Sequence, residues 1–222
     1  MNIFVLHYFD DKNSFNHRIF LRICDFFEQS GSNVETTELT HDNFDPVSGR
    51  NNFTACSNND FFSQKKEERH AAAQKTFHPD IEREIAKLEK CDFLLWQFPL
   101  RHFSMPAVLK GYIDKHFALG RIYGGLNIYE NGFFRGKRTL LSIVSDYDEE
   151  YFRPGGIHGN IHEILNPIHR GILQYIGFDV LGDQIFYAPD EKLPHEQDKM
   201  IDDFLRRLSY ISAESPAVIT RY

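Results

Sequence analysis

Short apolar runs, separated by longer amphipathic stretches, dominate the hydrophobic pattern of this chain. Compact apolar runs lie at residues 2–8, 92–97, 139–145 and 180–187, and residues 33–39 alternate between apolar and polar positions. Runs of this length that are rich in Phe, Ile, Leu and Val are typical of β-strands. The pattern therefore predicts five strands, with the first in a central position and the second in an outer one.

The stretches between these runs have helical periodicity. Apolar residues recur at three- and four-residue spacing between Ile19 and Phe27. Ser14 or Asn16 can cap this helix, and Gly31 fits as its stop. A polar segment of moderate helix propensity covers residues 59–74, and further helices are predicted at residues 79–90, 106–117, 162–177 and 191–209.

Alternating strands and helices predict a parallel sheet. Five strands in this sequence favour an α/β three-layer sandwich with the flavodoxin-like strand order 2-1-3-4-5. Residues 40–60 are rich in Asn, Asp and Ser, and they form a loop too long to be only a connector. We find no internal repeat and no second core, so we expect a single domain over residues 1–222, with an ordered core of about residues 1–212.

Composition narrows the functional class. The 222 residues are 41% hydrophobic and 26% charged, as in soluble globular proteins. The net charge of −7 argues against a nucleic-acid surface. The three cysteines form no C-x-x-C pair, which favours reduced thiols in a cytoplasmic protein. No apolar stretch approaches the roughly 18 residues of a membrane span, and the opening apolar run is too short for a signal peptide.

Two segments follow strands and are candidates for ligand binding. In an open α/β sheet, ligands bind at the carboxyl ends of the strands. The residues after 92–97 mix aromatic and polar groups, which suits a planar ligand that also makes hydrogen bonds. Ser14-Phe15-Asn16 opens a helix directly after the first strand, where unpaired N–H groups and the helix dipole favour a pyrophosphate. Taken alone, these three residues fit an ordinary helix cap better than a phosphate site.

Further segments share a pattern with known enzymes: Gln97-Phe98-Pro99-Leu100, Pro106-Ala107-Val108-Leu109-Lys110-Gly111-Tyr112, Gly156-Ile157-His158-Gly159 and Gly171-Ile172-Leu173-Gln174-Tyr175-Ile176-Gly177-Phe178. With Ser14-Phe15-Asn16, they resemble the NAD(P)H:quinone oxidoreductase (DT-diaphorase) family over residues 1 to about 212. The resemblance implies a homodimer that holds FAD, with FMN as the alternative. It also implies that hydride passes from NADH or NADPH to a quinone-like acceptor, with the active site at the subunit interface.

The same resemblance implies a set of cofactor-binding residues: His7, Ser14, Phe15 and Asn16 at the pyrophosphate, Pro99, Leu100, Arg101, His102 and Phe103 at the flavin ring, and Ser145, Asp146 and Tyr147 after the fourth strand. Arg101 and His102 stand where the animal enzymes carry Gln-Trp. A cation near the N1–O2 edge of the ring would favour the anionic reduced flavin. Arg101 also fits a surface position. Asp146 and Tyr147 replace two glycines of relatives, so this loop must bend away or cover the flavin differently.

His158 matches a family histidine beside the flavin, where a tyrosine helps it to stabilise charge. Phe152 stands opposite that tyrosine and cannot donate a hydrogen bond. Either Tyr151 supplies the hydroxyl after a one-residue shift, or His158 acts alone. We therefore expect His158 and Tyr151 to be catalytic, and we expect Tyr123, Phe103 and His158 to bind substrate. Tyr123 matches a residue that closes the pocket from the partner subunit.

These features predict an NAD(P)H dehydrogenase (quinone) with ping-pong kinetics, because donor and acceptor would use one pocket in turn. Two alternatives come from other classes: a flavin-binding regulatory subunit of a potassium efflux system, and a flavin-binding module without turnover. Azo or nitro compounds are alternative acceptors. No metal site is expected, because His158 and His162 lack the intervening Glu of a helical zinc motif.

Overall fold

A parallel β-sheet forms the centre of the computed structural model, which describes residues 1–40 and 44–220. β1 (Asn2–His7) pairs with β2 (Asn33–Glu38) on one side and with β3 (Phe93–Pro99) on the other. β3 pairs in turn with β4 (Arg138–Ser145). The order β2-β1-β3-β4-β5 confirms the predicted flavodoxin-like order. Residues 41–43 of the predicted loop and the last two residues of the predicted domain lie outside the described residues.

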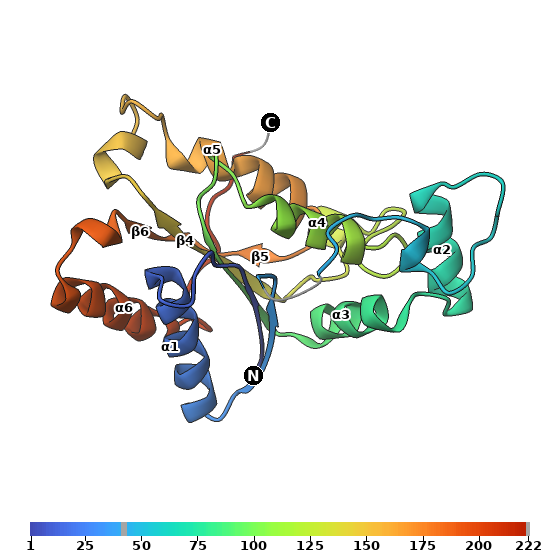
Figure 1. The fold of residues 1–222 in the computed structure, drawn as a ribbon, viewed down its shortest axis with the longest axis horizontal. Helices are drawn as coiled ribbons and strands as arrows, with labels where there is room; N and C mark the ends of the chain where they lie inside the picture. The colour runs from blue at the N-terminus through green and yellow to red at the C-terminus, as the bar shows by residue number, and fades with distance from the viewer. Residues whose placement is uncertain (41–43, 221–222) are drawn as a thin grey trace.

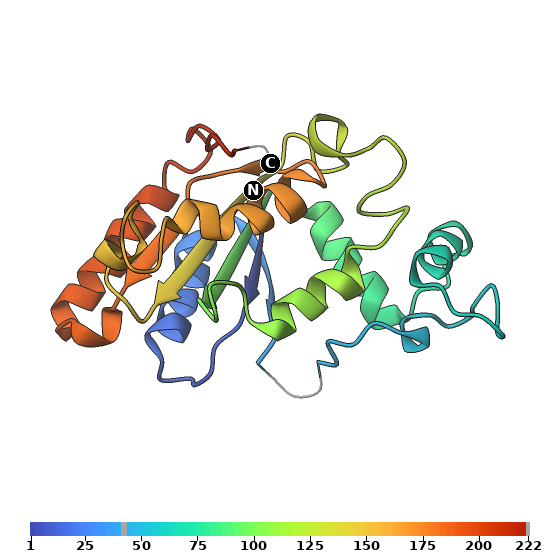
Figure 2. The same ribbon diagram turned by 90° about the horizontal axis from the view of Figure 1, so that it is seen from above.

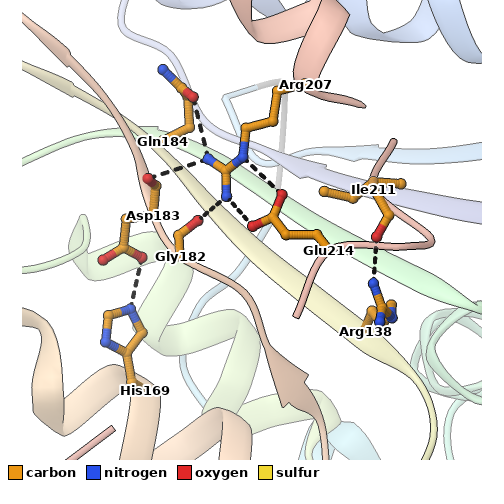
Figure 3. A network of polar contacts seen from close by, with 8 residues as sticks. All are labelled: Arg138, His169, Gly182, Asp183, Gln184, Arg207, Ile211 and Glu214. Carbon is orange, nitrogen blue, oxygen red and sulfur yellow. Dashed lines mark hydrogen bonds and ion pairs between the residues drawn. The ribbon is translucent and has the colours of Figure 1, made fainter. Parts of the chain in front are cut away.

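The predicted fifth strand over residues 180–187 is wrong in one respect, because it is not continuous. β5 (Asp179–Val180) and β6 (Gln184–Tyr187) both pair with β4, and residues 181–183 leave the ladder between them. The guanidinium group of Arg207 donates to the carbonyl oxygens of Gly182 (2.5 Å) and Asp183 (3.3 Å), and the Glu214 carboxylate holds it in place (Figure 3). These carbonyl groups therefore bond to a side chain from the end of the chain instead of to β4.

Helices cover both faces of the sheet, which gives the three predicted layers (Figure 1). One face carries α1 (Phe15–Gln29) and α6 (Pro194–Leu208), and the other carries α3 (Pro79–Lys90), α4 (Ala107–His116) and α5 (Ile161–Ile168). Successive side chains of a strand point to opposite faces. In β1, Ile3 and Val5 therefore join the core beneath α1, whereas Phe4 and Leu6 join the core beneath α3 and α4.

The helix boundaries follow local signals in the sequence. Of the two predicted caps, the structure uses Ser14, whose Oγ accepts a hydrogen bond from the His17 N–H at 3.1 Å. Gly31 ends the same helix with φ 79°, a value that glycine adopts without strain. The predicted helix over residues 162–177 instead changes from α5 into a π-helix at His169–Gln174. Pro167 explains the change, because it lacks an N–H donor and disturbs the regular helical ladder.

One helical segment extends away from the sheet. The polar stretch predicted over residues 59–74 forms α2 (Gln64–Gln74), which projects to one side together with residues 44–63 (Figure 2). Short 3-10 helices complete the described elements: Arg50–Asn52, Tyr129–Asn131, Glu149–Phe152 and Pro189–Glu191. Within residues 1–40 and 44–220, no helix has the length and apolar character needed to cross a membrane.

Candidate functional site

The strand register places three loops at one edge of the sheet. His7 pairs with Gln97 at the end of β1, and Pro99 pairs with Val144 at the end of β3. Pro99 is thus the last residue of β3 and not a loop residue as expected. The segments after β1, β3 and β4 all leave this edge, which is where ligands bind in open α/β folds.

The first loop ends at the N-terminus of α1, which presents unpaired donors. Among the described residues, no hydrogen bond uses the backbone N–H groups of Phe15 and Asn16. The first turn contains no acidic residue, so the positive end of the helix dipole is not compensated. Two free N–H groups at a helix N-terminus form a site for an anion such as a phosphate.

The side chains of these two residues are turned away from that anion site. Phe15 is buried against the edge of Phe186, with ring centroids 5.5 Å apart. The Asn16 amide nitrogen donates to the Tyr8 carbonyl oxygen at 2.5 Å, and its oxygen accepts from the Gln97 side chain. Asn16 therefore anchors the start of α1 to the ends of β1 and β3, and Phe15 anchors it to β6.

His7 lies in the core and does not reach the surface of the site. Its side chain is fully buried and stacks on Phe20 at 4.3 Å. Its Nδ1 lies 3.1 Å from the Gln97 carbonyl oxygen, whereas its Nε2 has no partner among the described residues. Burial lowers the pKa of His7 to about 3, so the ring is neutral at pH 7. The alternation of β1 indicates this position, since His7 shares a face with Ile3 and Val5.

The second loop forms a tight two-residue turn after β3. The Arg101 N–H donates to the Ser104 carbonyl at 2.9 Å, and the Ser104 N–H donates back at 2.8 Å. His102 (φ 47°) and Phe103 (φ 59°) both lie in the left-handed region, as a type I′ turn requires. Each costs roughly 1–3 kcal/mol of backbone strain, and such strain clusters at functional sites. The N–H groups of His102 and Phe103 have no hydrogen-bond partner among the described residues.

The Leu100 N–H, directly before this turn, bonds to the Val144 carbonyl at 2.8 Å and fixes the base of the turn to β4. Arg101 forms an ion pair with Asp10, which comes from the loop after β1. Sequence reasoning did not identify Asp10. The sequence does contain an indication of this pair: Asp10 and Arg101 carry opposite charges and lie in loops that follow two strands expected to be neighbours in a parallel sheet.

The third loop places His158 among four aromatic rings. The ring centroid of His158 lies 4.6 Å from Tyr147, 5.4 Å from Tyr151, 5.1 Å from Phe152 and 5.2 Å from Phe103. The Nε2 atom of His158 is buried and has no hydrogen-bond partner among the described residues. The structure thus brings together two predicted catalytic residues, a predicted substrate contact and Phe152, whose contact with His158 was not predicted.

Close backbone packing holds this third loop. The His158 N–H donates to the Tyr151 carbonyl at 2.9 Å. A Cβ at Gly156 would lie 2.6 Å from the same carbonyl oxygen and 2.5 Å from that of Glu150, so only glycine fits there. Tyr151 stacks on His158 with 30° between the ring planes, but no hydrogen bond joins its hydroxyl to the imidazole in the described residues.

Ser145 and Tyr147 start the third loop in a compact turn. The Ser145 Oγ accepts from the Tyr147 N–H and donates to the Tyr147 carbonyl, both at 3.1 Å. This turn directs the half-exposed Tyr147 ring against His158. Asp146, between them, is exposed. The loop thus packs Tyr147 on His158, and its position relative to a flavin stays a prediction.

Tyr123 lies elsewhere in the same chain. It packs against Tyr175 at 5.8 Å and lines a cavity of about 360 Å³ between α4 and the π-helix. Burial is the main cause that raises the pKa of Tyr123 to about 12. No residue of the His158 cluster lines this cavity. One copy of the chain therefore does not bring Tyr123 together with His158.

Comparisons with known proteins agree with this architecture. The sequence model of the flavodoxin-like fold family matches residues 1–209. Ribosyldihydronicotinamide dehydrogenase [quinone] of Mus musculus is 32% identical over 215 residues, which is 96% of this chain and 93% of that protein. NAD(P)H dehydrogenase [quinone] 1 of Rattus norvegicus is 32% identical over 207 residues, or 93% of this chain and 76% of that protein. The solved structure of a Klebsiella pneumoniae protein, assigned as a quinone reductase, superposes with a TM-score of 0.89 at 29% identity, covering 97% of this chain and 86% of that one.

Proposed function

This chain belongs to the flavodoxin-like fold family, and on that premise we propose that it is a flavin-dependent NAD(P)H oxidoreductase that reduces quinone-like acceptors. The observation that carries the proposal lies at one sheet edge: among the described residues, two sets of backbone N–H groups and the Nε2 of His158 have no hydrogen-bond partner there. The two mammalian relatives, both named as quinone dehydrogenases, support the reaction class.

The residues at this edge fit a flavin nucleotide. The N–H groups of Phe15 and Asn16 and the Ser14 hydroxyl suit its phosphate groups. The N–H groups of His102 and Phe103 suit the polar edge of a flat ring, and the rings of Phe103 and Tyr147 supply aromatic surface beside it. A bound flavin supplies a ring that accepts hydride from a nicotinamide and passes it on. We propose FAD, with FMN as the alternative, and NADH or NADPH as the donor.

His158 would stabilise negative charge in this site. Its buried Nε2 has no hydrogen-bond partner among the described residues, so this atom is available to donate a hydrogen bond. The surrounding aromatic rings shield the Nε2 atom from water, and electrostatic interactions strengthen where water is excluded. Tyr151 stacks on the imidazole and restricts its rotation. In this scheme His158 is the catalytic residue and Tyr151 acts mainly by positioning it.

The site would be completed by a second copy of the chain. Tyr123 lines a cavity that excludes the His158 cluster within one protomer. In a homodimer, Tyr123 of one protomer would close the pocket of its partner over Phe103 and His158. Donor and acceptor would then enter this pocket in turn, and initial-rate kinetics would be ping-pong.

The first test is the absorption spectrum of the purified protein. We expect bound flavin, released on denaturation and identified by chromatography as FAD or FMN. Turnover of a benzoquinone is then compared with NADH, NADPH and a truncated nicotinamide riboside as donors. A colourless protein that takes up neither FAD nor FMN in a titration would refute the proposal, as would flavin-loaded protein that none of the three donors reduces.

A further inference from the structure

One ion pair joins two of the loops at the site. The Arg101 side chain, in the turn after β3, meets the Asp10 carboxylate in the loop after β1. We propose that this pair is a clasp across the cofactor path, which positions the Arg101–Ser104 turn against the start of α1 and slows cofactor release. The inference rests on the proposed function, because it concerns how the flavin is retained.

Hydrogen bonds fix Asp10 and the residues next to it. The Tyr8 hydroxyl donates to its carboxylate at 3.0 Å. The Tyr8 backbone is itself fixed on both sides: its N–H donates to the Gln97 carbonyl at 3.0 Å, and its carbonyl accepts from the Asn16 side chain at 2.5 Å. The next residue, Phe9, donates its N–H to the Thr40 hydroxyl at 2.9 Å. Asp10 is therefore held at a defined place beyond the end of β1.

The backbone of Arg101 is fixed by hydrogen bonds, and its side chain extends to Asp10. Two hydrogen bonds to Ser104 close its turn, and the Leu100 N–H ties the base of the turn to β4. The strained residues His102 and Phe103 follow it directly. A contact that restrains the Arg101 side chain thus also restrains the turn whose N–H groups face outward.

The pair joins the loop that leads to the first set of donors to the turn that carries the second set. Asp10 precedes the free N–H groups of Phe15 and Asn16, and Arg101 precedes those of His102 and Phe103. A ligand whose anionic end meets the first set and whose ring edge meets the second would span the two loops that the pair joins. As a clasp over such a ligand, the pair opens before the ligand leaves.

A different role for Arg101 makes the opposite prediction. If Arg101 acted as a free cation beside the ring, Asp10 would weaken it by neutralising its charge. Removing the Asp10 charge would then tighten binding of the flavin. As a clasp, the pair predicts that removing either charge speeds release. Both side chains are about half exposed, at 47% and 51%, so the effect is that of a solvent-exposed ion pair, about two- to fivefold.

The experiment measures flavin dissociation from the holoprotein as the rise in flavin fluorescence after rapid dilution below the dissociation constant. We expect D10N and R101Q each to raise the dissociation rate about two- to fivefold, and the double variant to raise it no further than either one. The charge-swapped variant D10R/R101D should return toward the original rate. Raising salt from about 0.05 M to about 0.5 M should speed release from the unaltered protein but not from D10N.

The matched control is the ion pair between Arg22 and Asp202 (2.6 Å, 41% and 57% exposed), which joins α1 to α6 away from the site. R22Q should leave the dissociation rate unchanged. Thermal unfolding of each apoprotein identifies variants that alter the fold as a whole. Normal flavin binding with unchanged rates in D10N and R101Q would overturn the clasp alone. Failure of the unaltered protein to bind flavin would overturn the proposed function and the clasp with it.

Discussion

A negative charge placed at the start of α1 should keep or raise the stability of the apoprotein and lower its affinity for flavin. Ser14 caps this helix by accepting the His17 N–H at 3.1 Å. Asp and Asn are equally good capping residues, so S14D and S14N both keep this hydrogen bond. S14D adds a favourable interaction with the helix dipole, about 0.3–1 kcal/mol. The apoprotein of S14D should therefore be at least as stable as that of S14N.

The affinity of S14D for flavin should instead be lower than that of S14N. A phosphate bonded to the N–H groups of Phe15 and Asn16 would lie close to the new carboxylate, at about 5 Å, because the N-cap residue 14 directly precedes these two residues. Two unit charges at this distance repel by about 1–3 kcal/mol for effective dielectric constants between those of water and a protein surface. The flavin dissociation constant of S14D should thus be about 5- to 150-fold higher than that of S14N.

The assay is a fluorescence titration of apoprotein with FAD and with FMN, paired with urea unfolding of the same apoproteins. The difference between S14D and S14N should shrink as salt is raised, because screening weakens the repulsion. Equal affinity of the two variants at low salt would refute the phosphate site at α1. A less stable S14D apoprotein would refute the account of the cap.

Three further predictions concern the scaffold around the site. F152A should lower the free energy of unfolding by about 3–5 kcal/mol, because Phe152 is 2% exposed and packs on His158; F152L, which refills most of the space, should cost less in the same urea titration. Acid should destabilise the protein: burial lowers the pKa of His7 to about 3 and that of His116 to about 4, against an unfolded value of 6.5. The unfolded chain thus binds protons that the folded chain does not, and stability should fall as pH drops from 6.5 toward 4, by up to about 1.4 kcal/mol per pH unit for each histidine. Urea titrations at several pH values in this range should show that the free energy of unfolding depends less steeply on pH in H7Q. A free energy of unfolding that does not change with pH in the unaltered protein would contradict the lowered pKa values of the two histidines. R207M should lower stability by about 2–3 kcal/mol and speed hydrogen exchange near β6, while unchanged exchange there would disprove the role of Arg207 in breaking the fifth strand.

Local patterns predicted the elements that depend on local chemistry. The apolar runs at residues 2–8 and 92–97 identify β1 and β3, and alternation of strands with helices identifies the sheet order. Ser14 and Gly31 mark the ends of α1 because capping and positive φ depend on one residue each. The sequence also located the candidate loops, since in a parallel sheet all carboxyl ends that follow right-handed crossovers meet at one edge.

Features that depend on distant residues were not predictable in the same way. The break between β5 and β6 requires Arg207 and Glu214, which lie more than twenty residues further along the chain. The pairing of Asp10 with Arg101 depends on the register of β1 and β3 and on two loop conformations. The aromatic surroundings of His158 depend on how the segment 146–158 folds back, which no periodicity indicates. Sequence patterns determine where these loops begin, while tertiary contacts determine what their side chains meet.

The donors of the candidate site belong to the backbone, so the site depends little on which side chains the loops carry. The N–H directions at Phe15 and Asn16 follow from the helix start, and those at His102 and Phe103 follow from the turn, whatever the side chains are. Side chains of the same loops can therefore make other contacts, such as the Asp10–Arg101 ion pair and the packing of Tyr147 on His158. Tyr147, which by resemblance replaces a glycine, covers His158 from one side with its ring. A ring above His158 lowers its access to water, so the substitution should strengthen any charge stabilisation by Nε2 while narrowing the space left for an acceptor.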